Sequence, residues 1–172
     1  MRGGINPYLY GEGNPLSRND PLGLLSFFVH GQVTLQAFEG TGFSERFAWE
    51  VARANIQFDF IGGGATQEID MAYSHGMRPP NESPAQAKAK WESFVNYQIG
   101  LCNAQGLGWA IHGLQDAAAA GHQDFQEYGG ILRWRMIPHM FGDVFPSSTA
   151  RVEALATTRK AIEQFREKCG CR

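Results

Sequence analysis

Four segments of this 172-residue chain place apolar residues three and four positions apart, the spacing that lines one face of an α-helix. They cover approximately 43–57, 83–102, 107–121 and 147–168. The alternation of apolar and polar residues that is typical of strands is scarce. Hydrophobic residues make up 43% of the chain, which is enough for a packed core. The sequence therefore predicts an all-α domain.

The second segment has the clearest start signal. Ser83 precedes Pro84, and a serine N-cap followed by proline in the first turn is typical of a helix start. Between the helical segments, stretches at about 58–82 and 122–146 show no such spacing, and we expect long loops there. Loops of that length in a small domain are often functional.

Composition excludes several classes of protein. A net charge of -2 disfavours a protein that coats duplex nucleic acid by bulk charge. No apolar run approaches the ~20 residues of a membrane span, and the first residues lack the apolar core of a signal peptide. Three cysteines are too few for a disulfide scaffold, although Cys102 could pair with Cys169 or Cys171 in an oxidising compartment.

Residues 1–24 differ from the rest of the chain. They hold five of the 21 glycines and three of the eight prolines, a composition that favours turns and extended chain over helix. We therefore divide the chain into this segment and a helical domain over 25–172.

The first segment carries a specific pattern, Asn6-Pro7-Tyr8-Leu9-Tyr10 followed by Pro15-x4-Asp20-Pro21-x-Gly23-Leu24. This pattern resembles the end of the core of Rhs/YD-repeat proteins, where it marks the boundary between a large shell and a variable C-terminal toxin. The resemblance implies cleavage between Leu24 and Leu25. It also implies an Rhs shell, a secretion apparatus (often type VI) and a cognate immunity protein as partners. The toxin would be secreted into a target cell and act in the periplasm or at the membrane surface.

Histidine and aspartate recur at short spacing in the second half of the chain. His112 and Asp116 are four residues apart and project from one helix face. His122 follows six residues later, and His139 and Asp143 repeat the four-residue spacing. Imidazole and carboxylate together suit Zn²⁺. The set as a whole predicts a zinc site.

The pattern His112-x3-Asp116-x5-His122, followed by His139-x3-Asp143, resembles the trinuclear-zinc phospholipase C family, whose site is shared by fungal single-strand nucleases. The resemblance implies a compact helical domain and up to three zinc ions. One ion would be bound by Asp59, His75, His112 and Asp116. A second would be bound by His122, His139 and Asp143, and a third by His30, with Asp116 bridging to the first. Asp59 would position or deprotonate the attacking water, with Asp70 as its rival.

Two features depart from the family pattern. The phospholipases usually have Glu at the position of Asp143, whereas the nucleases have Asp. The family also binds its third zinc through its N-terminal residue, and cleavage after Leu24 would free the amine of Leu25, five residues before His30. We hypothesise that cleavage completes the third site. Equal zinc content before and after cleavage would contradict this.

Three zinc ions and three aspartates would leave the site at about +3, which attracts a phosphate and stabilises the charge that its hydrolysis adds. Together, the two family resemblances imply an antibacterial effector of phospholipase C type that hydrolyses membrane phospholipid, and we expect no stable complex with nucleic acid. One alternative is a zinc-dependent nuclease for single strands, which Asp143 favours. The other is a non-catalytic, zinc-stabilised interaction module.

Overall fold

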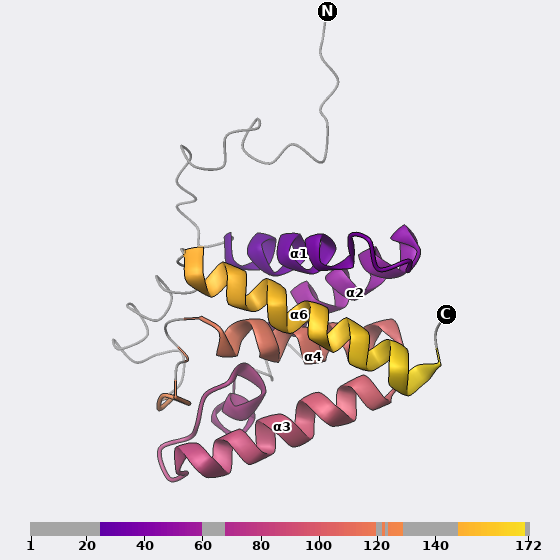
Figure 1. Ribbon diagram of the computed structural model, residues 1–172. Coiled ribbons are helices and arrows are strands. Elements are labelled where there is room, and N and C mark those ends of the chain that lie inside the picture. The colour runs from indigo at the N-terminus through magenta and orange to yellow at the C-terminus, as the bar shows by residue number, and fades with distance from the viewer. Residues whose placement is uncertain (1–24, 60–67, 120–121, 123, 129–147, 171–172) are drawn as a thin grey trace, which may run out of the picture.

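The computed structural model describes residues 25–59, 68–119, 122, 124–128 and 148–170, without the side chains of 25–28. This part of the chain forms five α-helices and one 3-10 helix (Figure 1). They are α1 (Leu25–Phe38), α2 (Glu45–Gln57), η4 (Ile69–His75), α3 (Pro84–Gly100), α4 (Ala104–Ala117) and α6 (Ser148–Cys169). The described residues contain no strand, only an isolated bridge between Arg78 and Glu127. The all-α prediction is confirmed.

Side-chain caps determine where three of the helices begin. Ser44 accepts a hydrogen bond from the backbone of Phe47 at the start of α2. Ser83 and Gln86 form a reciprocal capping box at the start of α3, which confirms the predicted start. Asn103 caps α4, so this helix begins at Ala104, earlier than the apolar spacing predicts, and it ends at Ala117 rather than at 121.

Two helical elements are not predicted by the apolar spacing. Helix α1 is apolar around most of its circumference because it packs against both α2 and α6, which removes the one-sided pattern. The 3-10 helix η4 lies within 58–82, where we expect only loop. Its seven residues are too few for a periodic pattern to be recognised.

Helix α4 is the centre of the domain. It packs against α2, α3 and α6, and Figure 1 shows it beneath α6 and above α3. Two glycines allow the close contacts. A Cβ at Gly108 would lie 2.7 Å from the carbonyl oxygen of Val51, and one at Gly113 would lie 2.5 Å from that of Ser74. These approaches bring the end of α2 and η4 next to the polar face of α4.

A disulfide joins Cys102, at the turn between α3 and α4, to Cys169 at the end of α6. Of the two pairings left open by the sequence, the structure has this one. Among the described helices, none combines the length and the hydropathy that crossing a bilayer requires.

We expect reduction of this disulfide to lower the free energy of unfolding by about 4 kcal/mol, because the bond closes a loop with a sequence separation of 67 residues. Denaturant titration of Cys169→Ser against the parent protein measures the change. Cys171→Ser is the matched control and should leave the unfolding midpoint unchanged. An equal loss in both variants would contradict the expectation.

Candidate metal centre

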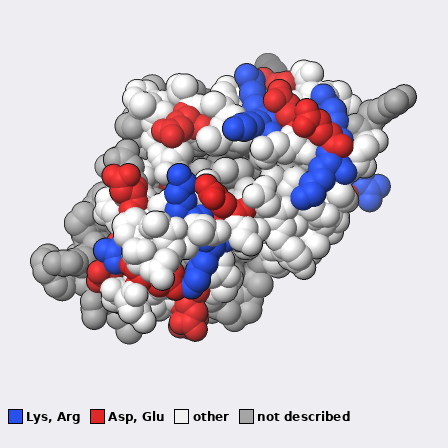
Figure 2. All heavy atoms as spheres, turned by 60° about the horizontal axis from the view of Figure 1, so that its bottom comes forward, with Lys and Arg blue, Asp and Glu red and all other residues white. Residues whose placement is uncertain are grey.

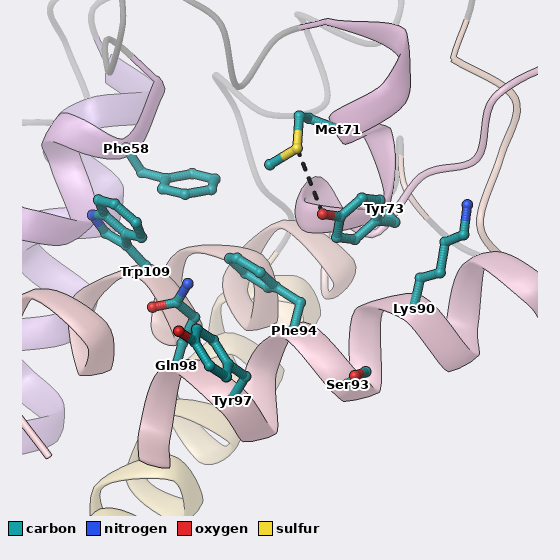
Figure 3. A pocket seen from close by; sticks show the side chains of 9 residues that line it. All are labelled: Phe58, Met71, Tyr73, Lys90, Ser93, Phe94, Tyr97, Gln98 and Trp109. Atoms are coloured by element: carbon teal, nitrogen blue, oxygen red, sulfur yellow. Dashed lines mark hydrogen bonds between the residues drawn. The ribbon is translucent and has the colours of Figure 1, made fainter. Parts of the chain in front are cut away.

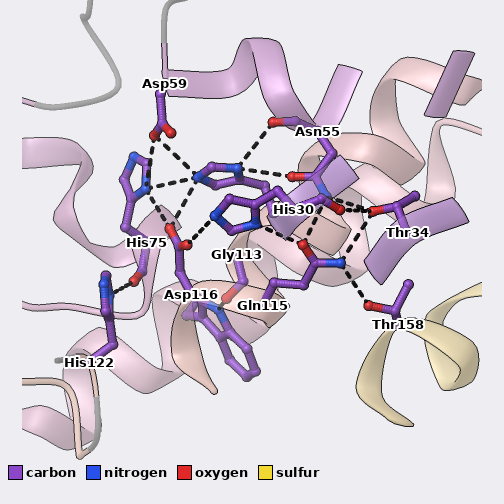
Figure 4. Close-up of polar contacts among 12 residues, drawn as sticks. His30, Thr34, Asn55, Asp59, His75, Gly113, Gln115, Asp116, His122 and Thr158 are labelled. Atoms are coloured by element: carbon purple, nitrogen blue, oxygen red, sulfur yellow. Dashed lines mark hydrogen bonds and ion pairs between the residues drawn. The ribbon is translucent and has the colours of Figure 1, made fainter. Parts of the chain in front are cut away.

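Five ionisable side chains from four elements converge at the C-terminal half of α4 (Figure 4). They are His30 of α1, Asp59 just after α2, His75 at the end of η4, and His112 and Asp116 of α4. Their ligand atoms form two groups, one of His30, His112 and Asp116 and one of Asp59, His75 and His112, in each of which all atoms lie within 4.8 Å of one another. The described part of the chain therefore holds buried imidazole and carboxylate groups positioned to bind a metal ion.

Asp116 lies between two sets of histidines and presents a different oxygen to each. Its Oδ1 lies 3.2 Å from Nε2 of His30. Its Oδ2 lies 2.8 Å from Nδ1 of His75 and 3.1 Å from Nε2 of His112. A carboxylate with this arrangement can bridge two ions.

Asp59 closes the second group from the side opposite Asp116. Its Oδ1 lies 3.3 Å from Nε2 of His112 and 3.7 Å from Nδ1 of His75. The two ring nitrogens themselves are 3.2 Å apart. Two imidazole nitrogens and two carboxylates that face one point form the donor set that zinc and similar divalent cations prefer. The residues present therefore fit a metal ion.

The outward nitrogens of two rings contact side-chain amides. Nδ1 of His30 lies 2.7 Å from Oε1 of Gln115. Nδ1 of His112 lies 3.0 Å from Oδ1 of Asn55 and 3.1 Å from its backbone oxygen. The sequence analysis missed both amides. Gln115 lies between His112 and Asp116 in an otherwise mainly apolar helix, and a third polar residue beside this pair is the signal that could have identified it.

Burial makes the charges of the cluster interdependent. Burial disfavours the imidazolium form of His112, but the carboxylates of Asp116 and Asp59 outweigh this effect and raise its pKa to about 10. Burial also opposes the charged form of Asp116, yet the opposite charge and hydrogen bond of His112 hold the pKa of that carboxyl well below its usual range. The same balance lowers the pKa of Asp59.

The raised pKa of His112 predicts a pH-dependent metal affinity. A cation bound at Nε2 must displace the proton that this ring carries at pH 7. We expect zinc binding to release about one proton from His112 and the affinity to rise about tenfold per pH unit between pH 7 and 9. Calorimetric titration in buffers of different ionisation enthalpy measures both quantities, and a pH-independent affinity would contradict the expectation.

The metal-free protein should show the opposite trend in stability. The pKa of His112 is higher in the folded state, about 10, than its ordinary value of 6.5. This shift stabilises the fold fully below pH 6.5, and the contribution is lost as the pH rises through about 10. The thermal midpoint of the metal-free protein should therefore fall between pH 7 and 10.

Six further predicted residues lie apart from the cluster or outside the described residues. His122 is buried and its Nδ1 contacts the backbone oxygen of His75, so it helps to fix the backbone at His75. Its expected zinc partners, His139 and Asp143, lie outside the described residues, as does Leu24. Asp70, the rival of Asp59, is exposed in the first turn of η4. Leu25 is the first residue of α1.

A cavity of about 680 Å³, whose lining residues are drawn in Figure 3, adjoins the cluster at Phe58. The buried ring of Phe58 separates the two, with its centroid 4.8 Å from that of His112 and 5.5 Å from that of Trp109. The side-chain oxygen of Gln98 is buried here without a hydrogen-bond partner among the described residues. The cavity is lined by Phe58, Met71, Tyr73, Lys90, Ser93, Phe94, Tyr97, Gln98 and Trp109.

No protein-family model, curated protein or solved structure matches this chain. The geometry of the cluster and the motifs in the sequence are therefore what indicate a function.

Proposed function

We propose that the chain is a metal-dependent phosphodiesterase of phospholipase C type, with zinc as its metal and membrane phospholipid as its substrate. One observation carries the proposal: the two oxygens of Asp116 face different histidines, at 3.2 Å on one side and 2.8 and 3.1 Å on the other. A carboxylate placed in this way could bridge two ions in a centre that holds more than one. Single-ion structural sites need no such bridge.

Zinc, when bound, supplies Lewis acidity toward a phosphoryl oxygen and makes water a stronger acid. The protein's own groups hold and orient the reactants. Asp59 is the most exposed member of the cluster, with 19% of its side chain accessible, so it can contact a water molecule. Its lowered pKa keeps it charged at neutral pH, and a charged carboxylate orients such a water by accepting its hydrogen bond.

The proposal extends to the biological setting that the first 24 residues suggest. The domain would be the C-terminal toxin of an Rhs protein, released by cleavage after Leu24 and delivered into a target cell by a secretion apparatus. An immunity protein would protect the producing cell. The pattern from Pro15 to Leu24 supports this part of the proposal.

Two surface features support a lipid substrate. Figure 2 shows basic and acidic side chains interspersed on one face of the domain, without the continuous basic stripe that a nucleic-acid track requires. The cavity behind Phe58 is walled mainly by aromatic side chains and by Met71, which can accept apolar parts of a lipid.

One observation favours the alternative of a single-strand nuclease. The rings of Phe94, Tyr97 and Trp109 in the same cavity could stack on a base.

Incubation of the zinc-loaded protein with phosphatidylcholine vesicles and with single-stranded DNA separates these functions. We expect release of phosphocholine, its loss on chelation and its recovery with added zinc. Cleavage of DNA alone would overturn the lipid proposal and support the nuclease. Loss of folding on chelation without hydrolysis of either substrate would identify a zinc-stabilised interaction module.

A further inference from the structure

Two buried threonines on different helices each donate their hydroxyl proton to a backbone oxygen of their own helix. The hydroxyl of Thr34 in α1 donates to the backbone oxygen of His30 at 2.8 Å, and that of Thr158 in α6 donates to the backbone oxygen of Ala154 at 2.6 Å. Both threonines are fully buried. A hydroxyl carries one proton. Toward every other neighbour, each threonine oxygen can therefore only accept a hydrogen bond.

This restriction determines how two amides are turned. The side-chain nitrogen of Gln115 lies 3.2 Å from Oγ1 of Thr34 and 3.0 Å from Oγ1 of Thr158. The side-chain nitrogen of Asn55 lies 2.8 Å from Oγ1 of Thr34. Only N–H groups can satisfy these acceptors, so each amide directs its nitrogen at the threonines and its oxygen elsewhere. The nitrogen of Asn55 also donates to the oxygen of Gln115 at 3.0 Å, which is consistent with both orientations.

The two amide oxygens then determine which ring nitrogen of His30 and of His112 carries a proton. Oε1 of Gln115 lies 2.7 Å from Nδ1 of His30, and Oδ1 of Asn55 lies 3.0 Å from Nδ1 of His112. An amide oxygen has no proton, so Nδ1 must be the donor in both rings. The opposite nitrogen, Nε2, faces Asp116 at 3.2 Å in one ring and 3.1 Å in the other.

We propose that Thr34 and Thr158 are positioning residues that act through Gln115 and Asn55 to keep the Nδ1 protons of His30 and His112 directed away from the metal centre. Nε2 of each ring is then the nitrogen that binds the cation, and it is oriented toward the site before binding. The role of this arrangement in metal binding rests on the proposed function, whereas the orientation of the two rings does not. Helix α6 contributes no ligand to the described cluster, yet it helps to orient one.

Long-range ¹H–¹⁵N spectra of the histidine rings in the metal-free protein test the orientation directly. We expect Nδ1 of His30 and of His112 to carry a proton that exchanges slowly with water, whether or not Nε2 is also protonated. A ring with an unprotonated Nδ1 and a protonated Nε2 would overturn the proposal. This measurement needs neither metal nor activity.

Zinc affinity tests the remote contribution of α6. Thr158→Val removes the acceptor for Gln115 while keeping the shape of the side chain, and we expect roughly a 10- to 100-fold loss of zinc affinity with a faster exchange of the His30 Nδ1 proton. The matched control is Thr157→Val, because the hydroxyl of Thr157 donates to the same backbone oxygen of Ala154, at 3.1 Å, from a partly exposed position. The control should change neither quantity.

A second pair of variants removes the effect of packing. Thr158→Ser and Thr158→Ala both lose the methyl group, but only alanine loses the hydroxyl. Serine should retain the zinc affinity of the parent protein and alanine should lose it. Equal affinities in this pair would overturn the proposal even if the valine variant unfolds. A parent protein that binds no zinc would instead refute the proposed function, while the spectra would still decide the ring orientation.

Discussion

Asp116→Ala is expected to abolish hydrolysis and to lower zinc affinity by more than about 100-fold. The substitution removes both oxygens of the carboxylate that lies within 3.2 Å of three imidazole nitrogens. Loss of supporting contacts alone typically costs metal sites 10- to 100-fold in affinity, and loss of a bridging ligand should cost more. Zinc content after dialysis and turnover of phosphatidylcholine measure the two effects.

Asp70→Ala is the control for this variant, since it removes an exposed carboxylate from η4 and should leave zinc content and turnover unchanged. Circular dichroism of both variants separates loss of ligand from loss of fold. Asp116→Asn adds a test that keeps the shape of the side chain. Full zinc content in Asp116→Ala would contradict a metal centre at this position.

The second large effect is expected for Asp59→Asn, which should keep most of its zinc and lose turnover by roughly 10²–10⁴-fold. His75, His112 and Asp116 remain as ligands, and the amide oxygen of asparagine can still coordinate. Asparagine is uncharged, however, so the variant lacks the carboxylate that accepts a hydrogen bond from the water molecule and orients it. Turnover should fall mainly through kcat rather than KM.

The exposed Asp70 again provides the matched substitution, and Asp70→Asn should retain the turnover of the parent protein. If Asp59→Asn were fully active and Asp70→Asn inactive, the role of orienting water would pass to Asp70. If Asp59→Asn lost zinc together with turnover, the main role of Asp59 would be that of a zinc ligand.

Most of the helices could be predicted from the sequence because their apolar residues recur three and four positions apart. Helices α2, α3, α4 and α6 all fall on segments with apolar spacing, and Ser83 identifies the start of α3. Helix α1 was missed because it is apolar around most of its circumference and its sequence shows no one-sided spacing. The pattern of a single helix does not reveal how many neighbours will cover it.

Site residues that lie close together in the sequence could be predicted from it, whereas those from distant segments could not be predicted from spacing alone. His112 and Asp116 share one face of one helix, which their spacing alone predicts. His30, Asp59 and His75 required the family resemblance, and the structure brings all three around His112, His30 in one group and Asp59 and His75 in the other. The supporting residues Asn55, Gln115, Thr34 and Thr158 come from four helices and form no sequence motif.

The amino-acid sequence by itself determined the helical character of the chain and the supply of imidazole and carboxylate groups, because periodicity and residue chemistry are local properties. Only the tertiary structure decided which groups meet. Close packing at Gly108 and Gly113 brings α2 and η4 against α4 and so places Asp59 and His75 beside His112. Ring orientation depends on hydrogen bonds between residues up to 85 positions apart, and such contacts exist only once the chain has folded.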